Sequence, residues 1–253
     1  MKKRHIFFVL PICAWLLGSC AKEGTPETVE DSNLIDIHLS ASCESTRSVL
    51  GPDMHTHLWA EGDKIAVFDG GAIREFTLVS GAGTSSAVFT GRVSSSSTNL
   101  VAVSPYSAAS LKSRVVNQTV PSEQAAPLSG ADPAALVMRA ECARGETLKF
   151  SNQTSLMVFS VPEGVSSVVL TALDGGVLAG ESSSVRVTLG GGAGQYAAVV
   201  NPGEYNGISV VVEAASGTYY KSSSNTVKAQ RSAGVNLGAI ELSHPVVLIK
   251  TIR

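Results

Sequence analysis

The 253-residue sequence predicts an all-β protein with two antiparallel β-sandwich domains. From residue 34 onward, apolar residues recur at every second position in short runs, which is the periodicity of half-buried strands. Gly, Ser, Asn and Pro separate these runs at roughly the 8-to-12-residue spacing that is typical of sandwiches. No helical pattern alternates with the runs, as a parallel sheet would require.

The composition supports a folded chain and excludes several other classes. Hydrophobic residues make up 44% of the sequence and charged residues 16%, so neither a disordered chain nor a coiled coil fits. The formal net charge is −2, and no basic cluster lies outside the first residues. We therefore expect no nucleic-acid partner.

Residues 1–19 have the pattern of a signal peptide, with a basic start, an apolar stretch and small residues at the end. The apolar stretch is shorter than the about 17 to 25 residues of a membrane span. The sequence Leu-Gly-Ser-Cys at residues 17–20 resembles the bacterial lipobox. We therefore expect lipidation of Cys20, which would become the mature N-terminus and anchor the chain to a bilayer. The alternative is an ordinary signal peptide that ends in Cys.

The mature chain is expected to begin with a flexible tether and to continue into two domains. Residues 20–33 comprise the lipidated Cys and a polar, acidic stretch without apolar periodicity. The N-terminal sandwich is expected over residues 34–143 and the C-terminal sandwich over residues 144–253, because a proline-punctuated stretch of long loops at residues 105–133 precedes the boundary.

The first expected strand carries Ile35, Ile37 and Leu39 on one face. A hairpin of type I′ is expected at Asp174-Gly175-Gly176, since that turn favours Asp-Gly. Further strands are expected over residues 64–68, 74–79, 87–90, 99–104, 134–139, 147–150, 156–161, 167–172, 185–189, 195–200, 208–214, 218–221 and 236–242.

Residues 58–68, with the sequence Leu-Trp-Ala-Glu-Gly-Asp-Lys-Ile-Ala-Val-Phe, resemble the fimbrillin family of Bacteroidetes. The first domain of that family carries a Trp, a Gly-Asp turn and an alternating strand. Trp59 and Gly62 stand at the first two of these places. The likeness continues in order along nearly the whole mature chain, over residues 76–78, 87–91, 102–106, 120–124, 148–152, 156–159, 196–205 and 234–238.

The resemblance implies a lipoprotein precursor of a pilus subunit, with two transthyretin-like, Greek-key β-sandwich domains. It implies export to the cell outer membrane, where an arginine-specific protease removes the first strand. A strand donated by the next subunit then fills the opened groove, which is β-strand complementation. The partners implied are other pilus subunits and, through the lipid anchor, the outer membrane of a cell that displays the fimbria on its surface.

A candidate cleavage site follows the first expected strand. On the family analogy we expect proteolysis between Arg47 and Ser48, which would free the strand bearing Ile35, Ile37 and Leu39. The alternative is an ordinary surface arginine in a loop.

The C-terminal residues 245–253 form a strongly β-prone tail, which is the candidate donor strand. The alternative is an edge strand of the C-terminal sandwich's own sheet. A donor would be unpaired in the isolated monomer, whereas an edge strand would be protected. One face of the tail presents Val246, Leu248, Lys250 and Ile252, and the other presents Val247, Ile249 and Thr251.

Cys43 and Cys142 are the only thiols outside the signal peptide and the lipid anchor. A disulfide between them is one candidate arrangement in an exported protein, and two free, buried thiols are the other. His55 and His57 have no third ligand of defined position, so no metal site is expected. The motifs of hydrolases and phosphate-binding loops do not occur, and we expect no cofactor and no enzyme activity.

The leading hypothesis is therefore a structural or adhesive pilus subunit. The alternative is a monomeric surface lipoprotein, or a tip or anchor accessory subunit, that binds a host protein or a glycan. The sequence offers few aromatic platforms for a glycan, because one of its two Trp residues lies in the signal peptide.

Overall fold

The computed structural model describes residues 33–43, 58–106, 118–128 and 130–242, and its regular secondary structure is entirely β-strand. The all-β class predicted from the sequence is confirmed. Within this described part of the chain, no helix is long and apolar enough to cross a membrane. The strands are β1 (Leu34–Cys43), β2 (Lys64–Phe68), β3 (Ile73–Ser80), β4 (Ser86–Ser94), β5 (Asn99–Ser104), β6 (Glu123–Ala126), β7 (Met138–Ala143), β8 (Leu148–Asn152), β9 (Ser155–Val161), β10 (Val165–Ala172), β11 (Ser184–Leu189), β12 (Gly194–Val200), β13 (Gly203–Ala214), β14 (Gly217–Ala229) and β15 (Gly234–Ala239).

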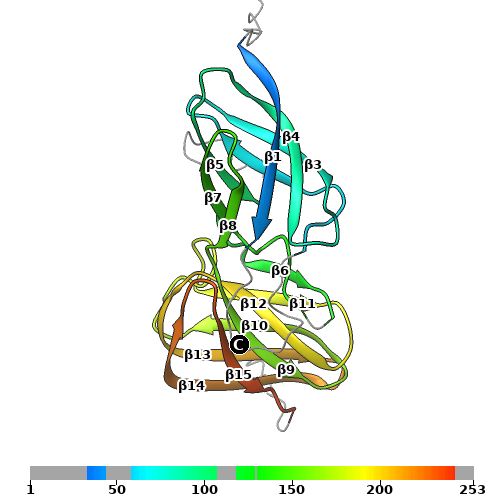
Figure 1. The fold of residues 1–253 in the computed structure, drawn as a ribbon. Coiled ribbons are helices and arrows are strands. Elements are labelled where there is room, and N and C mark those ends of the chain that lie inside the picture. The colour runs from blue at the N-terminus through cyan, green and yellow to red at the C-terminus, as the bar shows by residue number, and fades with distance from the viewer. Residues whose placement is uncertain (1–32, 44–57, 107–117, 129, 243–253) are drawn as a thin grey trace, which may run out of the picture. The chain divides into compact units, whose positions relative to one another are not determined.

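Seven strands form a closed barrel in the order β1-β4-β3-β2-β5-β7-β8 (Figure 1). The alternation in the sequence predicts a sandwich for this half of the chain, and the closed barrel corrects that prediction. The sheet closes because β1 pairs antiparallel with β4 on one side and parallel with β8 on the other. Parallel pairing between distant segments leaves no mark in local periodicity, so the sequence could not predict the closure.

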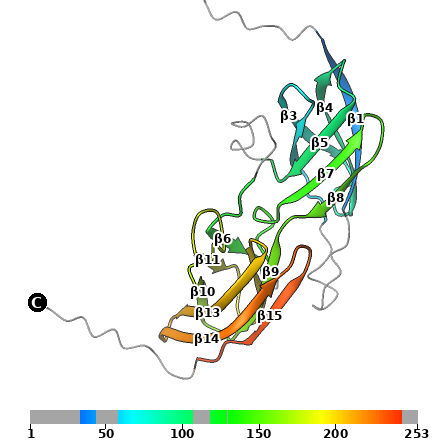
Figure 2. The same cartoon turned by 90° about the vertical axis from the view of Figure 1, so that its left-hand side faces the viewer.

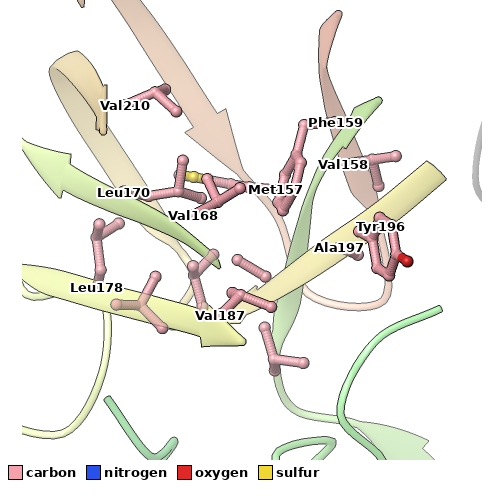
Figure 3. Close-up of a cluster of buried hydrophobic side chains, with 14 of the residues drawn as sticks. Met157, Val158, Phe159, Val168, Leu170, Leu178, Val187, Tyr196, Ala197 and Val210 are labelled. Atoms are coloured by element: carbon pink, nitrogen blue, oxygen red, sulfur yellow. The ribbon is translucent and has the colours of Figure 1, made fainter. Parts of the chain in front are cut away.

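The remaining strands form two sheets that share one core. The larger sheet has the order β14-β13-β10-β11-β6, and the smaller has the order β12-β9-β15. Their facing side chains form an apolar core, and Figure 3 shows a part of it with Met157, Phe159 and Leu170. This part of the chain is therefore a sandwich of a five-stranded and a three-stranded sheet.

Strand β6 lies in the stretch that was predicted to be long loops, so that prediction was wrong. β6 pairs parallel with β11 and belongs to the larger sheet of the sandwich. Its buried positions are Gln124 and Ala126, neither of which is a large apolar residue. The usual strand signal is therefore weak here.

The turn after β10 also differs from its prediction. Gly175 has φ +77°, but Ser232 is the only non-glycine residue with positive φ in the described part of the chain. Asp174 therefore does not adopt the type I′ conformation, which needs positive φ at both central residues. The chain instead reaches β11 through a longer connection, in which the Asp174 carboxylate accepts hydrogen bonds from the amides of Gly176 (2.9 Å) and Asn206 (2.6 Å).

Sheet membership does not change at residue 144, where a domain boundary is predicted. β6 lies before that residue and pairs in the sandwich, whereas β8 lies after it and pairs in the barrel with β1 and β7. The chain thus leaves the barrel for β6, returns to it for β7 and β8, and then completes the sandwich.

Candidate functional site

Strand β1 is the element on which the predicted function depends, and its two edges are held very differently. Along β4 it is paired from Leu34 to Ser42. Along β8 it is paired only over Ala41–Cys43. β1 therefore closes the barrel between β4 and β8 (Figure 2). Its stretch of pairing with β8 is much shorter than its stretch of pairing with β4.

The side chains of β1 enter the core mainly near its C-terminal end. Leu39 and Ala41 are each 2% exposed, whereas Ile37 is half-buried and Ile35 is 38% exposed. Of the three residues predicted to fill a groove, Leu39 alone is fully buried. Ala41 is a fourth residue on the same face, and it was not predicted to be buried although it continues the same alternation. Its small side chain lies in the barrel core.

Three aromatic side chains line the place that β1 occupies, which we call the β1 slot. Phe89 of β4 lies opposite Leu39 in the register, and Phe150 of β8 lies opposite Cys43. Trp59 packs edge-on against both rings, with centroid distances of 5.0 Å to Phe89 and 5.5 Å to Phe150. All three belong to the buried core that contains Leu39 and Ala41, so removing β1 would uncover an aromatic surface between two unpaired strand edges.

The outer face of β1 contributes little to holding the strand. Asp36 and Arg92 form an ion pair of 3.8 Å, but both side chains are exposed, and such pairs contribute about 0 to 1 kcal/mol. At the two ends of the pairing, the Cys43 amide donates to the Ser85 carbonyl (3.0 Å) and the Ser95 amide to the Asn33 carbonyl (2.7 Å). β1 is thus retained by backbone pairing with β4 and, over three residues, with β8, by the buried Leu39 and Ala41, and by the half-buried Ile37 and Cys43.

The turn before β2 positions Trp59 beside the slot. Gly62 has φ +84°, and the Asp63 carboxylate accepts a hydrogen bond from the Ala60 amide (2.8 Å). The Trp59 amide donates to the Thr84 carbonyl (3.0 Å), which fixes the backbone next to β4. The Trp and Gly-Asp pattern singled out in the sequence therefore forms one local unit of the barrel.

Cys43 and Cys142 are both free thiols and both half-buried. Cys43 is the last residue of β1, and β8 separates β1 from β7, which carries Cys142. Two strand spacings of roughly 4.8 Å put their Cα atoms roughly 10 Å apart, beyond the reach of about 7 Å for a disulfide.

The environment of both thiols disfavours the reactive thiolate. Burial, and then the nearby Asp63 carboxylate, raise the pKa of Cys43 to about 12. Burial, and then Glu146, also raise the pKa of Cys142. Both thiols are therefore protonated near neutral pH and are poor nucleophiles.

Asp69 is the buried carboxylate of the barrel, and its oxygens are fully used inside the fold. Oδ1 accepts from the amides of Gly71 (3.0 Å) and Ala72 (2.8 Å), and Oδ2 accepts from the Ser94 amide (3.0 Å) and from Nε of Arg74 (3.2 Å). Burial alone would raise the pKa of Asp69, but these hydrogen bonds outweigh it and lower the pKa below its ordinary value. Asp69 therefore joins the β2–β3 turn to β4 as a structural group.

Several predicted site residues lie outside the described part of the chain. They are Cys20, Arg47, Ser48, Val246, Val247, Leu248, Ile249 and Ile252. Within the described part, no group of three or more His, Cys, Asp or Glu side chains could hold a metal ion.

Comparison with known proteins gives a likeness of fold. No protein-family model matches the sequence, and no curated protein matches it either. A solved candidate cell adhesion protein from Bacteroides ovatus is similar in structure, with a TM-score of 0.51 and 14% identity over 81% of this chain and 92% of that chain.

Two further solved structures are more distant. A fimbrial protein from Bacteroides ovatus gives a TM-score of 0.43 at 14% identity, over 84% of this chain and 51% of that chain. A fimbrial assembly protein from Parabacteroides distasonis gives 0.41 at 11% identity, over 81% and 91% of the two chains. The similarity with a TM-score above 0.5, to the candidate cell adhesion protein, is a likeness of fold that covers most of both chains.

Proposed function

We propose that this protein is a structural or adhesive subunit of a cell-surface pilus, assembled by exchange of the first strand. In this proposal Cys20 carries the lipid that anchors the precursor to the outer membrane, and an arginine-specific protease cuts between Arg47 and Ser48. Residues 246–252 of another copy then enter the β1 slot. In the same proposal, the barrel and the sandwich are the counterparts of the two transthyretin-like, Greek-key domains that the family resemblance implies.

The position of β1 is the observation that carries the proposal. It is the first strand of the described chain, it lies between β4 and β8 in the closed barrel, and its Leu39 and Ala41 side chains reach the core. Cleavage after Arg47 would sever it from every other strand without breaking another pairing. The uncovered edges of β4 and β8 and the aromatic slot between them are what a donated strand would need.

The similar solved structures support the same class of function. The relative with the higher TM-score is described as a candidate cell adhesion protein, and others are described as fimbrial. A surface location and a role without catalysis fit both descriptions.

The proposal is tested by limited proteolysis of the chain that begins at residue 21. Brief treatment with an arginine-specific protease is expected to give a new N-terminus at Ser48 and a ladder of oligomers on a denaturing gel that is loaded without boiling. The matched control is Arg47→Ala, which should stay uncut and monomeric. Deletion of residues 246–253 should allow the cut but abolish the ladder.

A different result would redirect the assignment. An uncut, compact monomer from the unaltered chain would contradict strand exchange. It would favour an anchor subunit or a monomeric surface lipoprotein that binds a host protein or a glycan.

A further inference from the structure

The two sheets of the sandwich are unequal in width, which leaves one end of the sandwich open. The smaller sheet ends at β15, which pairs only with β9 in the described chain. The larger sheet ends at β14, which pairs there only with β13. The hydrogen-bonding edges of β14 and β15 that face away from these partners are therefore free within the described residues.

A groove runs between these two end strands, and we define it by Val210, Lys221, Val227, Val235, Leu237 and Ile240. It consists of two adjoining hollows of about 340 and 330 Å³ that share Val210, Lys221 and Ile240. Its floor is apolar, since Val210 and Ile240 are 8% and 5% exposed and belong to the sandwich core, where Figure 3 shows Val210 near Leu170.

The middle of β14 has no facing strand. Lys221 lies opposite Val210, and Ser223 lies opposite Ile208, so both share the inward face of the sheet with buried residues of β13. Lys221 and Ser223 are nevertheless exposed, whereas Tyr219 and Ala229 near the two ends of β14 are buried. The smaller sheet is therefore one strand short at this position.

The opposite end of the sandwich is closed by a specific contact. The buried Gln124 side chain of β6 donates to the Val199 carbonyl (2.7 Å) and accepts from the Val199 amide (2.9 Å), which joins the larger sheet to β12 of the smaller one. No such bond between the two sheets occurs at the β14–β15 groove among the described residues.

We propose that residues 246–252 of the same chain occupy the β14–β15 groove in the monomer, as a strand added to the free edge of β15. The described chain ends at Leu242, and Ile240 and Glu241 already line the groove. The three residues 243–245, with the sequence Ser-His-Pro, suffice for a reversal. Seven residues span roughly 23 Å and the six of β15 roughly 20 Å, so the lengths match.

The sequence of the tail selects the face that turns inward. Val247, Ile249 and Thr251 form an uncharged face, whereas the other face carries Lys250. A buried, unpaired ammonium group is unfavourable, so the uncharged face covers Val210 and Ile240. Lys250 then points to solvent.

This placement gives the tail a resting site. If the proposed function holds, the same seven residues are stored on their own sandwich until they are donated to the β1 slot of another copy. The storage covers an apolar strand and the free edge of β15, both of which would otherwise favour aggregation.

Hydrogen exchange of the monomer tests the placement without polymerisation. The chain from residue 21 carrying Arg47→Ala cannot be cut at the candidate site, so strand exchange does not interfere. Amides of residues 246–252 are expected to exchange at least about tenfold more slowly than in the Ile249→Asp variant. The matched variant Leu248→Asp changes the outward face and should keep the protection.

A second pair of variants tests the groove itself. Ser223→Arg fills the groove from β14 and should release the tail, as seen by loss of protection at residues 246–252. The adjacent Ser224→Arg lies outside the groove lining and should have no effect. Neither residue is buried, so both variants are expected to fold.

Three outcomes would overturn the inference. The first is exchange of the amides of residues 246–252 in the monomer at the rates of an unstructured peptide. The second is an equal loss of protection in Ile249→Asp and Leu248→Asp. The third is protection that rises with protein concentration, which would assign the groove to the tail of a second copy. The oligomer ladder of cleaved protein is a separate readout. A tail that is unprotected in the monomer but required for the ladder would refute storage and leave the proposed function intact.

Discussion

At the scale of single residues, β1 acts through two side chains of different size. Leu39 and Ala41 reach the core beside Phe89 and Phe150, while Ile35 remains accessible to solvent. The apolar alternation of the sequence shows which face of the strand turns inward. It does not show how far along the strand burial extends, because that depends on where β8 begins to pair.

Leu39→Ala is expected to lower the free energy of unfolding of the barrel by about 2 to 5 kcal/mol, because it removes a buried side chain and leaves a cavity. Ile35→Ala on the same strand is the control and should change it by less than about 0.5 kcal/mol. Urea unfolding followed by Trp59 fluorescence measures both. Equal effects of the two variants would contradict the burial pattern.

Asp69 makes the stability of the barrel depend on acid pH. Its folded pKa is below the ordinary value, so its stabilisation is present above about pH 4 and is lost as the pH falls toward the folded pKa. Asp69→Asn removes the charge and replaces the oxygen that accepts from the Ser94 amide with an NH2 group, which is itself a donor. The free energy of unfolding is expected to fall by about 1.5 to 3 kcal/mol.

The measurement for Asp69 is the melting temperature of both proteins from pH 7 to pH 2. Other carboxylates with lowered pKa, such as Asp174 and Glu213, contribute equally to both curves. The difference between the curves should therefore be largest near neutral pH and shrink below pH 4. A difference that does not vary with pH would refute the role of the Asp69 charge.

At the scale of elements, local periodicity predicted most strands and failed where pairing is unusual. The predicted runs 64–68 and 99–104 are β2 and β5 to the residue. The run predicted at 134–139 contains the buried Ala135 and Val137, but the strand begins only at Met138, which pairs with Ser104 of β5 and Asn152 of β8. Apolar alternation predicts which residues are buried. It does not predict where the backbone hydrogen bonds of a strand begin, because that depends on the partner strand.

Strand β6 depends on Gln124 more than on apolar burial. Gln124→Ala would leave the Val199 amide and carbonyl without their side-chain partner inside the sandwich, at an expected cost of about 1 to 3 kcal/mol. Gln124→Glu keeps the acceptor but loses the donor, so it should be destabilising as well. Hydrogen exchange should become faster in β12 and stay unchanged in the barrel strand β3. Faster exchange in β3 as well would show that the contact is not local to the sandwich.

The close approach of β4 to the Phe76 side chain of β3 requires a glycine at position 91. A Cβ on Gly91 would lie 2.6 Å from the Phe76 ring and 2.8 Å from the Glu75 carbonyl oxygen. Gly91→Ala should therefore destabilise the barrel by about 1 to 3 kcal/mol through overpacking. Gly192→Ala, where a Cβ meets no atom within 4 Å, is the control and should leave thermal unfolding unchanged. A stable Gly91→Ala variant would show that Phe76 can move.

At the scale of the whole molecule, the architecture depends on pairings between segments that are distant in sequence. β1 reaches β8, and β6 reaches β11, both in parallel. Composition and alternation predicted the all-β class, but a barrel followed by an unequal sandwich depends on these long-range pairings. If the proposed strand exchange holds, the groove of the unequal sandwich and the β1 slot of a cleaved copy would compete for the same C-terminal strand.

Trp59 reports directly on whether the β1 slot is filled. It is the only Trp from residue 21 onward, it is 1% exposed, and it contacts Phe89 and Phe150 in the core that β1 helps to form. Cleavage after Arg47 in a chain that lacks residues 243–253 should remove β1 with no donor available, so Trp59 emission should shift to longer wavelength as water reaches the ring. A synthetic peptide of residues 243–253, added in trans, should reverse the shift by supplying the strand.

The same peptide added to the uncleaved Arg47→Ala chain should leave the emission unchanged, because β1 still occupies the slot. A reversal by a peptide of scrambled order would mean that any apolar strand suffices, and a shift that no peptide reverses would mean that the barrel collapses once β1 is lost.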